Sequence, residues 1–227
     1  MAHINLRPHL KNNVVIYVHN PYCILIPLCY SRFKLIDQAF LNLSKNGFDL
    51  PKMSDELRNG ATFRGVPQTV IGHRLRLGDI FPSVTLVAPD LSHVALSQYA
   101  GTIRLISVIP SIDTGICDAQ TRRFSAEATK FGNNLQMITI STDMPFTQKR
   151  WLHDAQIDNI VMLSDHREMA FGYAAGIYVK EMRILQRSIF VVNRENRIVY
   201  CEYVREIGQH PDYDAALGVL KAIVNSQ

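Results

Sequence analysis

The chain has 227 residues, of which 47% are hydrophobic and 19% are charged, a composition that fits a folded globular protein and excludes an intrinsically disordered one. The net charge of +4 comes from residues 1–52, which hold six basic and two acidic side chains, whereas residues 53–227 hold equal numbers of both signs. Because the larger part has no basic stripe, we expect no nucleic-acid partner.

The cysteines do not form a disulfide scaffold or a metal site. Four cysteines are too few for a disulfide-rich chain of this length, and they lie at Cys23, Cys29, Cys117 and Cys201. No CxxC spacing occurs, and the eight histidines form no HxxxH pair. We therefore expect reduced thiols, no metal ion and no cofactor.

The first fifty residues differ from the rest of the chain. Residues 14–30 are strongly apolar, but Pro21 and Pro27 interrupt them and they fall short of the roughly 20 apolar residues that a membrane span requires. No small-residue cleavage site of a secretory signal follows them. We therefore expect no membrane association and a cytoplasmic protein.

The domain proper is predicted to begin near Met53, where turn residues and alternating patterns start. Residues 1–52 are then an N-terminal extension, either disordered and loosely attached or not part of the native protein. Residues 53–227 form one domain of ordinary size.

Within that domain the elements follow in a definite order. A hairpin around Gly65-Val66-Pro67 comes first, and two short strands separated by Pro89-Asp90 follow it. The remaining predicted elements are a buried strand at 103–109, a helix at 118–131, a strand at 135–141, a helix at 145–156 with proline in its first turn, a strand at 160–164, a helical turn at 168–173, an antiparallel pair at 188–193 and 197–204, and a helix at 212–226. This order predicts an α/β domain of the thioredoxin-like class.

The stretch IPSIDTGIC, residues 109–117, places Cys117 where a buried strand ends and a helix begins. Unpaired N–H groups and the positive dipole end of a helix stabilise a thiolate, which is the reactive form of cysteine. Thr114 is within reach of the sulfur or of a bound substrate, and Pro110 stiffens the turn. Alternatively, Cys117 is a small buried apolar residue and Thr114 is a helix cap.

Five motifs in order resemble those of the thiol peroxidase subfamily of peroxiredoxins. They are IPSIDTGIC at 109–117, DMPFTQKRWL at 143–152, LSDHR at 163–167, QRSIFVV at 186–192 and HPDYDAALGVLKA at 210–222. The resemblance spans residues 60–226. It implies a thioredoxin-like fold with a central mixed sheet flanked by helices and an N-terminal β-hairpin.

The same resemblance implies the roles of four residues. Cys117 would be the peroxidatic cysteine, which attacks a peroxide oxygen and becomes a sulfenic acid. Thr114 would hold the thiolate and the peroxide, and Pro110 would close the pocket. Arg187 would stabilise the thiolate and the charge that develops on oxygen, although an arginine before an apolar strand could equally be a surface charge.

One position departs from the family pattern. The motif that usually ends in a resolving cysteine has Leu152 there, and leucine cannot form a disulfide. Three routes stay open: reduction of the oxidised Cys117 by an external thiol, resolution by Cys201 in the middle of a strand, or resolution by Cys23 or Cys29. We favour the first, a one-cysteine cycle, because nothing in the sequence brings Cys201 within the distance that a disulfide requires.

Other polar and aromatic residues near these motifs have simpler interpretations. His153 and His166 are weak candidates for proton donors. Trp151 and Phe146 are expected to pack their helix onto the sheet, and Asp212 is expected to cap the last helix.

The sequence thus predicts a thiol-dependent peroxidase that reduces hydrogen peroxide and alkyl hydroperoxides. The resemblance implies a homodimer and a thiol reductant, usually thioredoxin, although the loss at Leu152 opens the way to a small thiol or a glutaredoxin-like donor. The alternative is a redox sensor or binding module on the same scaffold, in which Cys117 is oxidised with little turnover.

Overall fold

The computed structural model describes residues 10–11, 14–19, 22–27 and 56–225. The chain divides into two compact units, 1–50 and 51–227. In the first unit, strands β1 (Leu10–Lys11), β2 (Val14–His19) and β3 (Tyr22–Pro27) form an antiparallel sheet in that order. The predicted boundary after residue 52 lies outside the described residues, as does Cys29, so the assignment of 1–52 as an extension stays a prediction.

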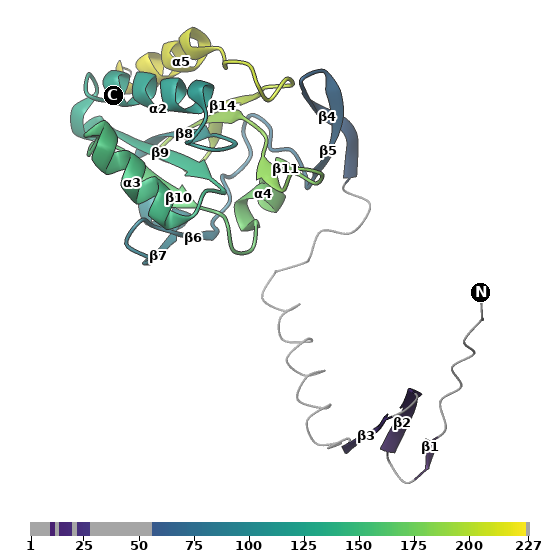
Figure 1. Ribbon diagram of the computed structural model, residues 1–227. Coiled ribbons are helices and arrows are strands. Elements are labelled where there is room, and N and C mark those ends of the chain that lie inside the picture. Colours follow the sequence, from purple (N-terminus) through teal and green to yellow (C-terminus); the bar gives the residue numbers. More distant parts are fainter. Residues whose placement is uncertain (1–9, 12–13, 20–21, 28–55, 226–227) are drawn as a thin grey trace. The chain divides into compact units, whose positions relative to one another are not determined.

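A seven-stranded mixed sheet organises the second unit, in the order β14-β13-β8-β9-β10-β6-β7 (Figure 1). Its strands are β6 (Thr85–Val87), β7 (His93–Ala95), β8 (Ile103–Val108), β9 (Leu135–Ser141), β10 (Val161–Ser164), β13 (Ser188–Val192) and β14 (Ile198–Tyr203). The central strands β8, β9 and β10 are parallel and the outer pairings are antiparallel. All six residues of β8 are buried, as the continuous apolar run predicted.

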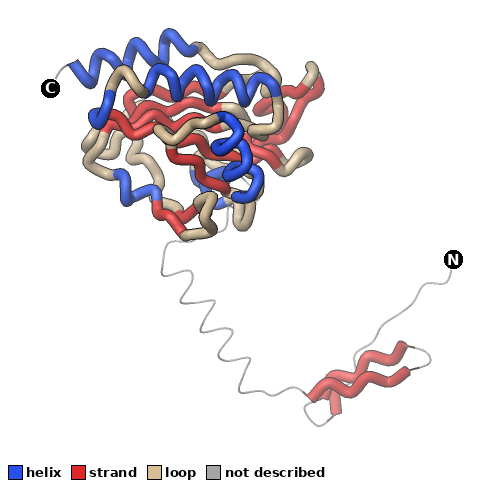
Figure 2. Tube along the Cα trace, turned by 60° about the vertical axis from the view of Figure 1, so that its left-hand side comes forward, coloured by secondary structure: helices blue, strands red, loops and turns tan. Residues whose placement is uncertain are grey.

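Helices cover both faces of this sheet. They are α2 (Gly115–Ala128), α3 (Pro145–Ala155), α4 (Ala170–Ala174) and α5 (Tyr213–Asn225), with short 3-10 helices at Leu96–Tyr99 and Gly132–Asn134. Helices α2 and α5 run side by side along one face in Figures 1 and 2. Between them, the Phe124 ring packs edge-on against the Tyr213 ring, with ring centroids 5.3 Å apart. The predicted thioredoxin-like arrangement of a mixed sheet flanked by helices is confirmed.

The alternation of side chains along β8 divides the core into two apolar clusters. Ile103 and Leu105 point to the cluster under α2, α3 and α5, which we call the helix-side cluster. Ile106 and Val108 point to the opposite face and pack with Phe171 of α4 in the second cluster. A residue's position in its strand therefore decides which cluster it joins.

A second, four-stranded sheet in the order β12-β11-β5-β4 contains the predicted hairpin. Its strands are β4 (Glu56–Phe63), β5 (Val66–Ile71), β11 (Tyr178–Val179) and β12 (Ile184–Leu185). The turn residues Arg64 and Gly65 have φ values of 51° and 78°, the left-handed conformation that two-residue hairpin turns favour. The sequence did not predict β11 and β12, because two-residue strands carry no periodic pattern.

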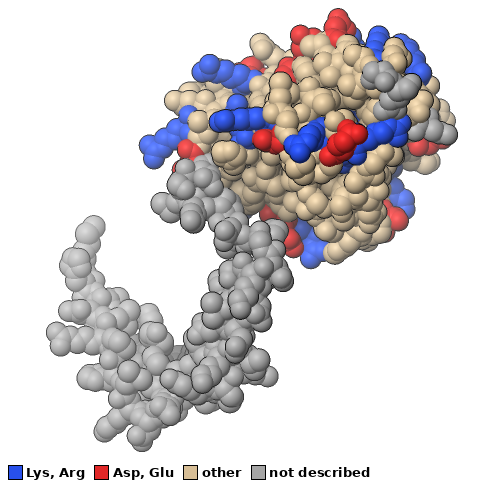
Figure 3. All heavy atoms as spheres, turned by 180° about the vertical axis from the view of Figure 1, so that it is seen from behind, with Lys and Arg blue, Asp and Glu red and all other residues tan. Residues whose placement is uncertain are grey.

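Several side chains test the packing predictions. Trp151 is buried in the helix-side cluster as expected, but the expectation for Phe146 is wrong, because 60% of its surface is exposed. Asp212 caps α5, since its Oδ1 accepts a hydrogen bond of 2.9 Å from the Ala215 N–H. Among the described residues, no helix is long and apolar enough to span a membrane. Acidic and basic side chains are interspersed on the face seen in Figure 3.

The buried carboxyl of Asp165 makes stability depend on pH. It accepts hydrogen bonds from the Phe171 and Gly172 N–H groups, yet burial raises its pKa from the ordinary 3.8 to about 6. The folded protein therefore holds this proton more tightly than the unfolded chain, so stability falls as pH rises from about 4 to 6, by about 3 kcal/mol in all. We expect Asp165→Asn to remove this slope in urea unfolding at pH 4.5 and 7, whereas the exposed Asp158→Asn should keep it. An unchanged slope in Asp165→Asn would contradict this assignment.

Candidate active site

Cys117 is the third residue of α2, directly after the loop that leaves β8. Thr114 has an extended backbone and precedes the helix, and the first helical hydrogen bond runs from the Asp118 N–H to its carbonyl at 2.9 Å. The Cys117 side chain has no exposed surface and belongs to the helix-side cluster. The sulfur therefore lies at the positive end of a helix in a site that excludes bulk water.

Arg187 approaches the sulfur from a distant part of the sequence. Strand β13 pairs with β8 so that Ser188 faces Val108, which places Arg187 just beyond the end of β8, where the chain turns toward α2. Its Nη2 donates a hydrogen bond of 3.3 Å to the Cys117 sulfur. Only 2% of Arg187 is exposed, so it is not a surface charge.

Gln120 holds the Arg187 guanidinium in place, and the sequence did not single it out. Its Oε1 accepts a hydrogen bond of 2.6 Å from Arg187 Nη1, and its Nε2 donates one of 2.8 Å to Ser107 Oγ. The Arg187 Nε donates to the Ile207 carbonyl at 3.1 Å. Each of the three guanidinium nitrogens thus has a partner, which fixes the arginine toward the sulfur. The sequence did contain one signal for this role: Gln120 is a polar residue three positions after Cys117, which places it on the same face of the helix.

Thr114 and Pro110 flank the site. The Thr114 hydroxyl donates to the Ser111 carbonyl at 2.9 Å, so its oxygen lone pairs are left to accept from a ligand. Thr114 is the N-cap residue of α2, but its side chain makes no capping hydrogen bond with the helix. Pro110 is buried, and both residues line the same pocket as Arg187.

This pocket has a volume of about 790 Å³ and mostly apolar walls. The apolar side chains are Phe63, Ile116, Met182, Ile184 and Ile207. Two of the elements that supply them, the hairpin β4–β5 and strand β12, belong to the four-stranded sheet. Two backbone hydrogen bonds join the hairpin to the loop after β14. The Thr62 N–H donates to the Arg205 carbonyl at 2.7 Å, and the Ile207 N–H donates to the Thr62 carbonyl at 2.8 Å. The second sheet therefore forms one wall of the pocket.

The segment that carries the cysteine, residues 111–118, is bound to the region around α3 at several points. Asp143 accepts hydrogen bonds of 2.7 Å from both the Ser111 hydroxyl and the Ile112 N–H. Two further contacts join Arg150 to Asp113 at 2.8 Å and the Trp151 indole N–H to Asp118 at 2.8 Å. These contacts hold the first turn of α2 in its helical conformation.

Among the described residues, no second cysteine takes over the role of the resolving cysteine that is missing at position 152. Leu152 is partly buried against the helix-side cluster, which contains Cys117. Cys201 packs against the second cluster, so the sheet separates the two thiols. Burial, and secondarily the charge of Asp79, raises the pKa of the Cys201 thiol, which lowers its reactivity at neutral pH. Of the other candidates, Cys23 lies in the first unit and Cys29 is outside the described residues.

The two histidines that the sequence offered as proton donors lie away from the pocket that contains Arg187. His153 is exposed and contacts Asp154 at 3.0 Å, and His166 contacts the Ser164 hydroxyl at 2.8 Å. Neither lines the pocket that contains Arg187, so neither is placed to give a proton there.

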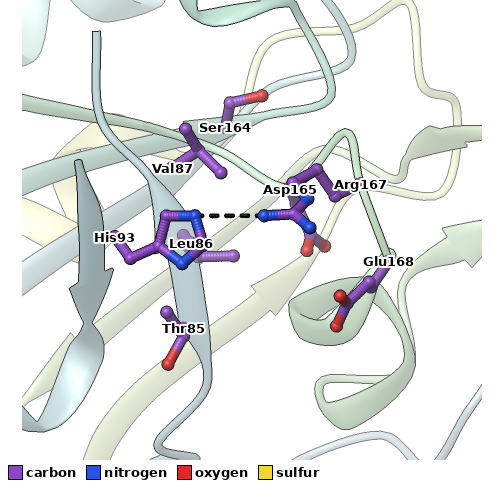
Figure 4. Close-up of a pocket in the computed structure, with 8 residues that line it drawn as sticks. All are labelled: Thr85, Leu86, Val87, His93, Ser164, Asp165, Arg167 and Glu168. Carbon is purple, nitrogen blue, oxygen red and sulfur yellow. Dashed lines mark hydrogen bonds between the residues drawn. The ribbon is translucent and has the colours of Figure 1, made fainter. Parts of the chain in front are cut away.

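A smaller pocket of about 110 Å³ lies between β6, β7 and the loop after β10 (Figure 4). There the Arg167 guanidinium contacts His93 at 3.0 Å, and none of the predicted site residues is present. No group of three or more metal-ligating side chains occurs among the residues that the structure describes.

Comparison with known proteins identifies the family. Residues 76–217 match the family model described as Redoxin. The chain is 47% identical to the thiol peroxidase of Halalkalibacterium halodurans over 161 residues, 71% of this chain and 96% of that protein. It is also 47% identical to the thiol peroxidase of Bacillus subtilis over 163 residues, 72% of this chain and 97% of that protein.

A solved structure agrees with this assignment. The crystal structure of a peroxiredoxin-like protein from Aquifex aeolicus superposes with a TM-score of 0.68 at 26% identity and covers 74% of this chain and 98% of that one. In this chain, the buried Cys117 at the start of α2 meets Arg187, the residue that precedes β13. The chain belongs to the redoxin family and, within it, to the thiol peroxidases.

Proposed function

We propose that Cys117 is the peroxidatic cysteine of a thiol-dependent peroxidase and that its catalytic cycle uses no second cysteine of the chain. The observation that carries the proposal is the 3.3 Å contact between the Arg187 guanidinium and the buried Cys117 sulfur at the start of α2. The Arg187 guanidinium and the helix N-terminus place positive charge beside the sulfur, where negative charge is carried during peroxide reduction.

The reaction breaks the peroxide O–O bond. The Cys117 thiolate attacks one oxygen of the hydroperoxide and becomes a sulfenic acid, and the other oxygen leaves as an alcohol or water after taking up a proton. The sulfur supplies both electrons, so the step needs no metal or cofactor.

The neighbouring residues have distinct roles in this step. Arg187 stabilises the thiolate and the negative charge that grows on the leaving oxygen, because its donors are already in position. The Thr114 oxygen can accept a hydrogen bond from the protonated peroxide oxygen, and Pro110 keeps bulk water from the sulfur. The mostly apolar walls of the pocket favour the alkyl group of a larger hydroperoxide.

Leu152 and the separation of Cys201 from Cys117 support an external thiol as the reductant. One thiol attacks the sulfenic acid and releases water, which leaves a mixed disulfide on Cys117, and a second thiol releases the enzyme as free thiolate. Thioredoxin remains a candidate donor. A homodimer, implied by the family resemblance, and a cytoplasmic location, expected from the sequence, are part of the same proposal.

Mass spectrometry after one equivalent of peroxide tests the cycle. In the absence of thiols we expect a sulfenic acid on Cys117, overoxidised to sulfinic acid by excess peroxide, and no disulfide to Cys201, Cys23 or Cys29. With thiols added, peroxide consumption should continue over many turnovers. An intramolecular disulfide would contradict the one-cysteine cycle, and arrest after one equivalent with every donor would favour a sensor.

A further inference from the structure

The Cys117 sulfur is poorly placed to meet the thiol of a protein. Its side chain has no exposed surface, and the contacts to Asp143, Arg150 and Trp151 hold the surrounding turn in place. A protein donor must bring its own cysteine to the sulfur, so the first turn of α2 would have to unwind and lose these hydrogen bonds. A small thiol must also displace the side chains that cover the sulfur, but it needs no room for a partner protein, because Thr114, Ile116 and Arg187 next to Cys117 already line a pocket.

The size of that pocket fits a small molecule. Its volume of about 790 Å³ lies in the range of ligand sites, about 300–1,000 Å³, which leaves room for a thiol with several heavy atoms. Arg187 lines the pocket and also contacts the sulfur. A thiolate that enters here therefore meets a cation next to the atom that it attacks.

A second cation lies on the pocket wall. The Arg64 guanidinium is placed over the Phe63 ring, 5.5 Å from its centroid, and forms no ion pair with any residue in the described range 56–225. The nearby carboxylate of Glu206 already accepts hydrogen bonds from the Thr62 hydroxyl at 2.8 Å and the Gly65 N–H at 3.1 Å. Arg64 is thus available to an anionic group of a ligand.

We propose that the thiol that regenerates Cys117 is a small, carboxylate-bearing thiol that enters the hydroperoxide pocket and pairs its carboxylate with Arg64. This inference rests on the proposed function. The thiolate of the first molecule attacks the sulfenic sulfur, an S–S bond forms, and the S–O bond breaks to release hydroxide, which takes a proton to become water. A second molecule attacks the outer sulfur of the mixed disulfide, so that the Cys117 thiolate leaves and a small-molecule disulfide is the oxidised product.

The test uses three thiols that differ only in their end group: 3-mercaptopropionate, 3-mercapto-1-propanol and 3-aminopropane-1-thiol. The full-length protein is first oxidised with one equivalent of peroxide, and the rate of Cys117 recovery is then measured with each thiol. Comparing Arg64→Gln with the unmodified protein for the same thiol cancels the intrinsic reactivity of that thiol. The matched control is Arg58→Gln, because Arg58 is an exposed arginine of β4 that does not line the pocket.

We expect Arg64→Gln to slow recovery with 3-mercaptopropionate by about threefold, to leave the neutral alcohol unchanged and to speed the amine, with no change for any thiol in Arg58→Gln. Peptide mapping should find 3-mercaptopropionate disulfide-linked to Cys117. Equal effects of Arg64→Gln on all three thiols would overturn the proposal. So would faster recovery with thioredoxin than with 3-mercaptopropionate at equal concentration. Failure of peroxide to oxidise Cys117 in the first step would instead contradict the proposed function.

Discussion

Replacing Cys117 with serine is expected to abolish thiol-dependent peroxide consumption, a loss of roughly 10³-fold or more. Serine fills nearly the same volume in the helix-side cluster, so the fold is kept while the nucleophile is lost. A hydroxyl cannot supply the two electrons that break the O–O bond. The measurement is steady-state consumption of tert-butyl hydroperoxide with excess dithiothreitol, with circular dichroism to check the fold.

Cys201→Ser is the matched control for this loss. Cys201 belongs to the cluster on the other face of the sheet, so its removal should leave peroxide consumption unchanged. If Cys117→Ser kept its activity and Cys201→Ser lost it, the assignment of the reactive sulfur would be wrong.

The second large effect is expected at Arg187, where lysine should slow the reaction of Cys117 with peroxide by roughly 10²-fold. Lysine keeps the positive charge, but it cannot reach the sulfur, Gln120 Oε1 and the Ile207 carbonyl together, as the guanidinium does. The developing charge on oxygen then loses a fixed donor. The rate can be followed by stopped-flow fluorescence of Trp151, the single tryptophan, which shares the helix-side cluster with Cys117.

A change of stability alone must be separated from this catalytic effect. Arg104→Lys provides the control, because Arg104 is also a buried arginine and donates to Asn196 Oδ1 at 2.7 Å, far along β8 from the Cys117 loop. We expect both variants to lower the unfolding temperature and only Arg187→Lys to lower the peroxide rate. Equal losses of rate in the two variants would mean that the arginine acts through stability.

The local signals of the sequence were sufficient for most of the fold. Apolar runs at 103–109 and 135–141 predicted buried strands that are present, and the helical spacing after Cys117 predicted α2. The helix begins three residues earlier than predicted, at Gly115, because the extended backbone of Thr114 ends the loop there. The sequence contained no signal for β11 and β12, because a strand of two residues is too short to show the alternation of apolar and polar side chains.

The sequence by itself also pointed to the chemistry of one segment: a cysteine at the start of a helix, with a threonine and a proline at fixed offsets. These features depend on residues close together in the chain, for which spacing is a direct guide to geometry.

Only the tertiary structure decided what surrounds that cysteine. Arg187 reaches the sulfur because β13 pairs with β8 in a register that no local pattern specifies. Gln120 became part of the site because its amide meets that arginine, and Phe146 is exposed because α3 turns this position away from the core. Cys201 lies on the opposite face from Cys117 because side chains alternate along a strand, so one residue of register determines whether two thiols can meet.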